Sequence, residues 1–323
     1  MAATNTSVAL PKTQAEWKKA LDELPLQPTK LPVFFFGHGS PMLAFPESAL
    51  SGRSDPVRAK MGPKGPLASF LKDFGPALLA KYKPKAIVVF SAHWETNGER
   101  LVTDYGDENP LLYDYFGFPP ALYELKFKSR GDPALSEHIV QLFKDAGYLA
   151  RTTTKLESRG LDGRGGRGPG AGFDHGVFVP FRLMFGEEFT DIPIVEVSMD
   201  GSLDPSKNWA IGQAVKQLRE EQVLILSGGL TVHNLGDWTA FVEDTASPAV
   251  KAFDQAILDA ANVPDATKRK QALVNLTKHA GFRLAHPRED HFVPIYIAAG
   301  AGEDGDVKTV SAIYGAPAFA FGV

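Results

Sequence analysis

Residues 86–93 have the sequence AIVVFSAH, and residues 222–229 have the sequence QVLILSGG. Both begin with a short continuous run of branched and aromatic residues, which is typical of a strand buried on both faces. Residues 31–36 (LPVFFF) and 192–198 (IPIVEVS) have the same character. Four such runs, spaced well apart along the chain, predict a central sheet of buried and largely parallel strands.

Longer segments between these runs carry apolar residues at helical spacing. They predict helices over residues 67–82, 133–146, 207–221 and 249–261. The alternation of strands and helices predicts an α/β fold, a three-layer sandwich with a largely parallel central sheet and helices on both faces. We expect one catalytic domain over residues 31–323, preceded by a polar N-terminal extension, residues 1–30. A short helix is expected near residues 14–24, where Trp17 and Leu21 share a face.

Composition excludes several classes of partner and chemistry. The 323 residues include 44% hydrophobic residues and have a formal net charge of -4, with no long basic run, so we expect no nucleic acid or membrane partner. Cysteine is absent, which excludes disulfides, thiolate metal ligands and a cysteine nucleophile. Residues 1–30 lack the apolar core of a signal peptide. We therefore expect a cytoplasmic protein that acts on small molecules through histidines and carboxylates.

Four of the eight histidines lie close to the end of a predicted strand or at the start of a predicted helix. They are His38 in FFFGHGSP, His93 in VVFSAHWE, His175 in GFDHGVFVP and His233 in LSGGLTVHN. The carboxyl ends of strands form the binding crevice of an open α/β sheet, so these side chains are expected to converge. We expect His38 and His93 to be metal ligands. A fifth histidine, His291 in HPREDHFVP, precedes an apolar stretch that is suited to a helix.

The other three histidines fit ordinary structural roles better. His138 lies inside the amphipathic run ALSEHIVQLF, and His279 in NLTKHAGF is expected in the last turn of a helix, where its charge meets the helix dipole favourably. His286 precedes Pro287 and is intermediate between the two groups.

Six short motifs in order resemble one enzyme family. They are GHGSPM (37–42), SAHWE (91–95), GFPPALYELKF (117–127), GFDHGVFVPF (172–181), SGGLTVHNL (227–235) and EDHFVP (289–294). Together they resemble the LigB-type extradiol dioxygenases, in particular the branch of 4,5-DOPA extradiol dioxygenase. The resemblance implies a non-haem metal enzyme that opens the ring of a catechol, DOPA-like or related, with O2.

The resemblance also assigns roles to the five histidines. It implies that His38, His93 and His291 hold the metal, that His233 is the acid/base residue, and that His175 contacts substrate or oxygen. The wider superfamily has a glutamate as third ligand, so Glu289 and Asp290 are alternatives ranked after His291. Fe(II) is expected for activity, and Zn(II) is expected in the protein as purified, because nitrogen ligands bind zinc more tightly than ferrous iron.

Ring cleavage makes demands that these residues can meet. A catechol and dioxygen need open metal positions side by side, which three protein ligands leave available. A nearby base must take a proton from the catechol hydroxyl and later return one, and histidine suits both steps. His233 is the candidate. Tyr113, Tyr115 and Phe116 in LLYDYFGFPP are candidates for lining an aromatic pocket.

Residues 159–172, RGLDGRGGRGPGAG, form a glycine- and arginine-rich insertion in which regular structure is improbable. About a dozen residues here precede the DHG segment where the family has a short turn. Arg159, Arg164 and Arg167 are suited to clamp a substrate carboxylate. The alternative is a solvated surface loop.

Two other functions use the same residues. A zinc hydrolase would ionise water on the three-histidine set, and a relative that has lost catalysis would keep the fold alone. The presence of all five histidines argues against the second. We favour the dioxygenase.

Overall fold

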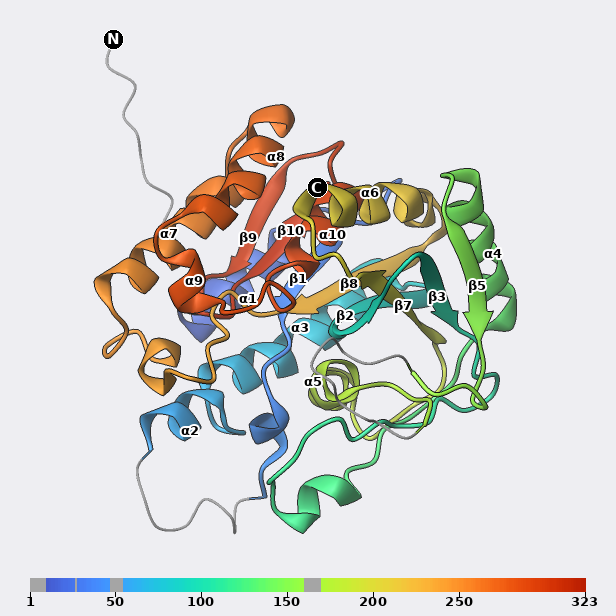
Figure 1. The fold of residues 1–323 in the computed structure, drawn as a ribbon, viewed down its shortest axis with the longest axis horizontal. Helices are drawn as coiled ribbons and strands as arrows, with labels where there is room; N and C mark the ends of the chain where they lie inside the picture. The colour runs from blue at the N-terminus through green and yellow to red at the C-terminus, as the bar shows by residue number, and fades with distance from the viewer. Residues whose placement is uncertain (1–9, 27, 47–54, 160–169) are drawn as a thin grey trace.

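The structure is a computed structural model that describes residues 10–26, 28–46, 55–159 and 170–323. Within these ranges an eight-stranded sheet has the order β5-β3-β7-β2-β8-β1-β10-β9, with helices on both faces (Figure 1). The strands are β1 (Val33–Gly37), β2 (Ala86–Thr96), β3 (Glu99–Thr103), β5 (Leu149–Thr153), β7 (Ile194–Asp200), β8 (Val223–Gly229), β9 (Val307–Ser311) and β10 (Ala318–Phe321). A separate small sheet pairs β4 (Lys128–Ser129) with β6 (Glu188–Phe189).

The four central strands β7, β2, β8 and β1 are parallel, as the sequence predicts. The antiparallel pairs lie toward the edges, where β3 pairs with β7 and β10 pairs with both β1 and β9. The four predicted apolar runs form these four central strands. One strand differs from the prediction, because β2 continues to Thr96 and contains His93 within it. Its pairing with β7 shifts register between Phe90 and Glu95.

Alternate residues of each central strand enter different apolar cores. Phe34 and Phe36 of β1 face one core, and Val33 and Phe35 face the other. The first core includes helices α1 (Gln14–Asp22), α2 (Pro56–Met61), α3 (Pro66–Tyr82) and α5 (His175–Phe185). The second includes α4 (Pro133–Asp145), α6 (Pro205–Val215), α7 (Pro248–Ala261), α8 (Ala266–Asn275), α9 (Phe282–Ala285) and α10 (Pro294–Ala301). The predicted three-layer sandwich is therefore confirmed.

The predicted helices have close counterparts in α3, α4 and α7. The fourth, predicted over 207–221, divides into α6 and the 3₁₀ helix η4 (Lys216–Glu221), a tightening that is common at helix ends. In the N-terminal segment, α1 packs against α3, and the indole of Trp17 donates a hydrogen bond to Asp73 at 3.0 Å. The division into an extension over residues 1–30 and one domain over residues 31–323 stays a prediction.

The structure describes only the ends of the glycine- and arginine-rich insertion at residues 159–172. Residues 160–169 lie outside the described residues, and Arg164 and Arg167 with them.

Over the described ranges, no helix combines the length and the apolar character needed to cross a bilayer.

Candidate metal centre

Two chain segments meet where β1 and β8 end. The backbone nitrogen of His38, the first residue after β1, donates to the carbonyl of Gly229 at 3.0 Å. The backbone nitrogen of Leu230, the residue after Gly229, donates to the carbonyl of His291 at 2.8 Å. A Cβ on Gly229 would lie 2.4 Å from that His291 oxygen, so only glycine permits the close approach. The ends of two strands thus hold the loop that carries His291.

Three imidazoles converge at this place. His38 follows β1, His93 belongs to β2, and His291 precedes α10, yet each offers a ring nitrogen and these three nitrogens lie within 4.8 Å of one another. All three residues are buried. Their ring centroids are 5.2 Å apart for His38 and His93, 5.1 Å for His38 and His291, and 4.7 Å for His93 and His291. The structure therefore brings together the three residues that the sequence marks as ligands.

Carboxylates orient two of these rings. Nδ1 of His291 lies 3.0 Å from Oδ2 of Asp290, and Nδ1 of His93 lies 3.4 Å from Oδ2 of Asp114. A carboxylate at Nδ1 favours the tautomer in which Nε2 carries the lone pair that a metal needs. Three buried imidazoles with carboxylate support form a donor set that fits a divalent transition metal.

Two further groups of possible ligands overlap with the first one. His93, Asp114 and His175 form one group, and His233, Asp290 and His291 form the other, each with ligand atoms within 4.8 Å of one another. Asp290, which the sequence offered as an alternative third ligand, therefore belongs to the group with His233 and His291. The carboxylate of Glu289 instead pairs with the guanidinium of Arg283, and among the described residues Glu289 belongs to none of the three groups.

His175 is the first residue of α5 and faces His93. Its ring centroid lies 4.1 Å from that of His93. Oδ1 of Asp114 lies 2.8 Å from Nδ1 of His175 and 2.9 Å from its backbone nitrogen. Asp174 caps the helix by accepting from Gly176 at 2.8 Å and is itself held by the hydroxyl of Ser91 at 2.7 Å. Side chains thus fix both the helix start and the ring.

His233 lies on the other side of the cluster. Its ring stacks on that of His291, with centroids 3.4 Å apart and an angle of 6° between the planes. Its backbone nitrogen donates to Ala285 at 2.8 Å. The side chain is partly exposed and lines a cavity, so it can reach both a bound molecule and the cluster.

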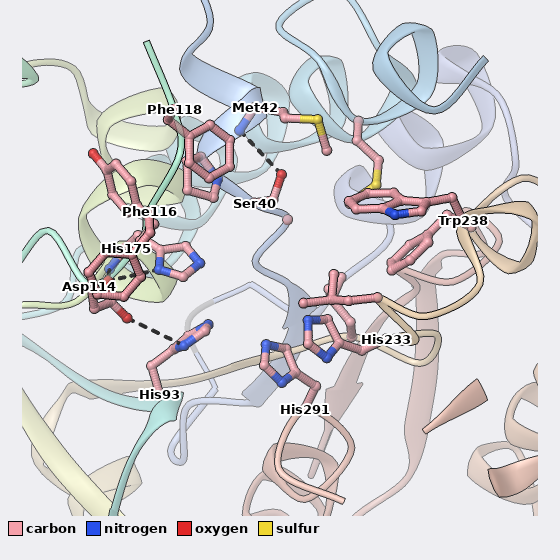
Figure 2. A pocket seen from close by; sticks show the side chains of 17 residues that line it. Ser40, Met42, His93, Asp114, Phe116, Phe118, His175, His233, Trp238 and His291 are labelled. Atoms are coloured by element: carbon pink, nitrogen blue, oxygen red, sulfur yellow. Dashed lines mark hydrogen bonds and ion pairs between the residues drawn. The ribbon is translucent and has the colours of Figure 1, made fainter. Parts of the chain in front are cut away.

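A cavity of about 410 Å³ opens above these histidines (Figure 2). Its described lining residues are Gly39, Ser40, Pro41, Met42, Met61, His93, Asp114, Tyr115, Phe116, Phe118, His175, Leu230, His233, Leu235, Trp238, Phe241 and His291. Tyr115 and Phe116 are among them, as the sequence predicts. Tyr113 is not, because its hydroxyl donates to Leu125 at 2.6 Å and its ring packs against Phe178.

Arg159 does not reach the cavity, so its predicted role in clamping substrate needs correction. Its guanidinium is buried, with Nη2 at 2.7 Å from Glu196 and 2.9 Å from Asp174, and it lies over the ring of Trp94. Burial raises the pKa of Glu196 well above its ordinary value, although the cation opposes this. For Asp174, burial is the largest single effect and acts in the same direction, but the charge of Arg159 together with hydrogen bonds from Glu196 and Ser91 lowers the pKa below its ordinary value. Arg159 thus balances a buried carboxylate beneath α5.

Several cavity residues were not predicted from the sequence. Asp114 lies between two residues that were singled out, Tyr113 and Tyr115, but a lone aspartate in a loop carries no signal of its own. Met42 and Trp238 lie in the short 3₁₀ helices η1 (Pro41–Ala44) and η5 (Trp238–Phe241), and Phe118 lies in a loop; all three segments are too short or too irregular for periodicity to indicate anything. Only their tertiary placement brings them to the cavity.

The remaining histidines have structural surroundings. His138 pairs with Glu221 at 2.9 Å, and His279 ends the 3₁₀ helix η6 (Leu276–Lys278). His286 is buried, and its Nε2 lies 2.9 Å from the carbonyl of Thr231. Burial lowers the pKa of His286 to about 4.

Comparison with known proteins identifies the family. The family model described as "Catalytic LigB subunit of aromatic ring-opening dioxygenase" matches residues 33–323. The chain belongs to the LigB family. The resemblance seen in the motifs is therefore confirmed, and with it the enzyme class, an extradiol ring-opening dioxygenase. Enzymes of this family depend on a metal, and the histidine groups above are candidates for holding it.

Individual relatives within the LigB family cover nearly the same length. A 4,5-DOPA dioxygenase extradiol-like protein of Schizosaccharomyces pombe is 41% identical over 95% of this chain and 97% of its own. The 4,5-DOPA dioxygenase extradiol of Beta vulgaris is 32% identical over 86% of this chain and 89% of its own. A crystal structure of an uncharacterized Escherichia coli K12 protein has the same fold, with a TM-score of 0.60 at 21% identity, over 91% of this chain and all of the other.

Proposed function

We propose that this chain opens the ring of a catechol by extradiol cleavage with O2, using a non-haem metal ion held by His38, His93 and His291. The observation that carries the proposal is the meeting of three buried histidine nitrogens within 4.8 Å of one another, with His93 and His291 in the lining of the cavity. When bound, the metal supplies open positions at which the two catechol oxygens and dioxygen lie side by side.

His233 is the acid/base residue in this proposal. It lines the cavity and stacks on His291, so its ring nitrogens are within reach of a catechol hydroxyl directed at the cluster. It takes the hydroxyl proton when the catechol binds and returns a proton after ring opening. An unperturbed histidine pKa near working pH suits both transfers.

His175 contacts the substrate or oxygen on the opposite side. The carboxylate of Asp114 contacts Nδ1 of His175, so Nε2 is the ring nitrogen of His175 that can face the substrate. Tyr115 and Phe116 line the same wall and are suited to pack against the aromatic ring. The substrate ring then lies between this wall and His233.

Fe(II) is the working metal in the proposal, and Zn(II) is the ion expected in protein purified from a heterologous host. The usual order of divalent affinities places zinc above ferrous iron on nitrogen ligands. Occupancy by zinc is therefore compatible with iron chemistry.

The test is anaerobic reconstitution of the full chain with ferrous iron, followed by a panel of catechols that includes DOPA. Admission of O2 should produce yellow semialdehyde products and consume one O2 per ring opened. A matched sample loaded with zinc should yield no such product. Iron-loaded protein that binds its metal but opens no catechol would contradict the proposal.

A zinc hydrolase is the second candidate, because a set of three neutral histidines is also typical of catalytic zinc. Hydrolysis of ester or amide substrates by the zinc-loaded form, combined with no ring opening by the iron-loaded form, would favour it.

A further inference from the structure

The cavity lining has a polar part and an apolar part. Histidines and Asp114 form the polar part, and the ring oxygens of a catechol would face them if the proposed function is right. The apolar part is formed mainly by Met42, Met61, Phe118, Leu235, Trp238 and Phe241. At about 410 Å³ the cavity falls in the range that accommodates drug-sized ligands, so there is space beyond the ring for a substituent.

The apolar character continues to the rim. Phe116, Leu235 and Trp238 are 76%, 53% and 49% exposed, and all three line the cavity. Figure 2 shows Phe116 and Trp238 on opposite sides of the opening, with the histidines between them. Large apolar side chains that gather at the opening of a cavity while exposed to water commonly mark the place where an apolar ligand group packs.

The described lining includes no lysine and no arginine. Basic side chains on nearby segments are already engaged. Lys60 donates to the carbonyl of Phe241 at 2.7 Å, and Arg288 pairs with Glu95 at 2.8 Å. Arg159 is held in its buried ion pairs. A carboxylate on the substituent would therefore lose hydration without gaining a cation from the described part of the chain, which costs free energy.

We propose that the natural substrate is a catechol whose substituent is uncharged and apolar, rather than one that carries a carboxylate. This proposal rests on the proposed function, since it assumes that the ring oxygens face the histidine cluster. The substituent then packs between Met42 and Phe118 on one side and Leu235 and Trp238 on the other.

A matched pair of ligands tests the proposal: 4-(3-methylbutyl)catechol and 3-(3,4-dihydroxyphenyl)propanoate, which have nearly the same shape and differ in charge. Their dissociation constants are measured by calorimetry on the zinc-loaded protein, and kcat/KM is measured on the iron-loaded protein. We expect the alkyl compound to bind about tenfold more tightly or better, and to be favoured by a similar factor in kcat/KM. The neutral propanamide should bind with intermediate affinity.

Equal or tighter binding of the carboxylate would overturn the proposal. If the carboxylate compound is bound more tightly and opened, the proposed dioxygenase function stands while the inference about the substituent fails. If neither catechol is bound or opened, the proposed function fails, and the inference fails with it. The two failures are therefore distinguishable.

Two sets of variants test whether the absence of a cation causes the preference for the alkyl compound. Leu235→Arg places a cation at the rim and should shift the ratio of the two dissociation constants toward the carboxylate. Leu149→Arg, at a site 73% exposed on the edge strand β5, should leave that ratio unchanged. Arg164→Gln with Arg167→Gln tests the arginines outside the described residues. An unchanged ratio supports the proposal, and loss of carboxylate binding in this double variant would contradict it.

Discussion

Asp114 joins His175 to His93 through a single carboxylate. Oδ1 lies 2.8 Å from Nδ1 of His175, and Oδ2 lies 3.4 Å from Nδ1 of His93 (Figure 2). The carboxylate also accepts from the backbone nitrogen of His175 at 2.9 Å. One side chain thus orients a proposed metal ligand and the histidine proposed to contact substrate.

Asp114→Asn should weaken metal binding by roughly 10- to 100-fold, the usual effect of removing a carboxylate that orients a ligating histidine. If the amide oxygen keeps the contact with His175, the amide nitrogen donates toward His93. Nδ1 of His93 must then accept, and its proton moves to the nitrogen that would hold the metal. Zinc affinity is measured by chelator competition. Asp107→Asn, on an exposed residue of the same loop, is the control, and equal affinities for both variants would contradict this role.

The proposed ligands and the proposed acid/base residue should respond differently to truncation. His38→Ala, His93→Ala and His291→Ala should each weaken metal binding strongly. His233→Ala should retain the metal and reduce kcat by roughly 10²- to 10⁴-fold. Metal content and single-turnover rates separate the two effects. Stoichiometric metal in His291→Ala would instead favour Asp290 as the third ligand.

The four central strands were predictable because they are buried on both faces, and continuous apolar runs such as 223–226 mark them. The strands toward the edges, β3, β5, β9 and β10, were not predicted; β5 and β9, for example, alternate or mix exposed and buried residues. The end of β2 was not predictable in the same way, since residues 91–96 mix polar and apolar side chains. They remain in the strand because neighbouring strands bury them across the register shift.

The site was predictable only in part. The rule that strand ends converge anticipated the meeting of His38 and His93. His93 lies inside β2, but it comes after Ser91, the last residue of β2 that pairs with β8, so it still reaches the same end of the sheet as His38. Asp114 reaches the cavity from a loop and Trp238 from a short 3₁₀ helix, and the paths of both segments depend on tertiary packing. Arg159 shows the opposite error. Its place in a glycine-rich segment suggested an exposed substrate clamp, but two buried carboxylates hold the guanidinium in the interior.

Gly176→Ala should disturb the metal centre without contacting a ligand nitrogen. A Cβ there would lie 2.7 Å from Oγ of Ser91, 2.8 Å from Cδ2 of His93 and 2.9 Å from Oδ1 of Asp174. Something must shift, and the ring of His93 is the group that bears on function. We expect weaker zinc binding with helix content preserved by circular dichroism. Gly236→Ala is the control, since the nearest neighbouring atom is the side-chain oxygen of Asn234 at 3.2 Å. Unaltered zinc affinity in Gly176→Ala would show that the site adjusts around the methyl group.

His286 should make the fold sensitive to acid. Burial lowers its pKa to about 4, and its contact with the carbonyl of Thr231 only partly opposes this. In the unfolded chain the pKa is about 6.5. Between these values the unfolded state binds a proton that the folded state does not, so stability is present above the unfolded pKa and is lost as pH falls toward the folded pKa. From about pH 7 to about pH 5 this loss amounts to about 2 kcal/mol.

Urea unfolding at both pH values should therefore show a larger loss of unfolding free energy for the wild type than for His286→Gln, whose amide can still donate to Thr231 and does not titrate. His138→Gln, at a partly exposed histidine paired with Glu221, should follow the wild type. If His286→Gln and the wild type lose equal stability over this range, His286 does not account for the acid sensitivity of the fold.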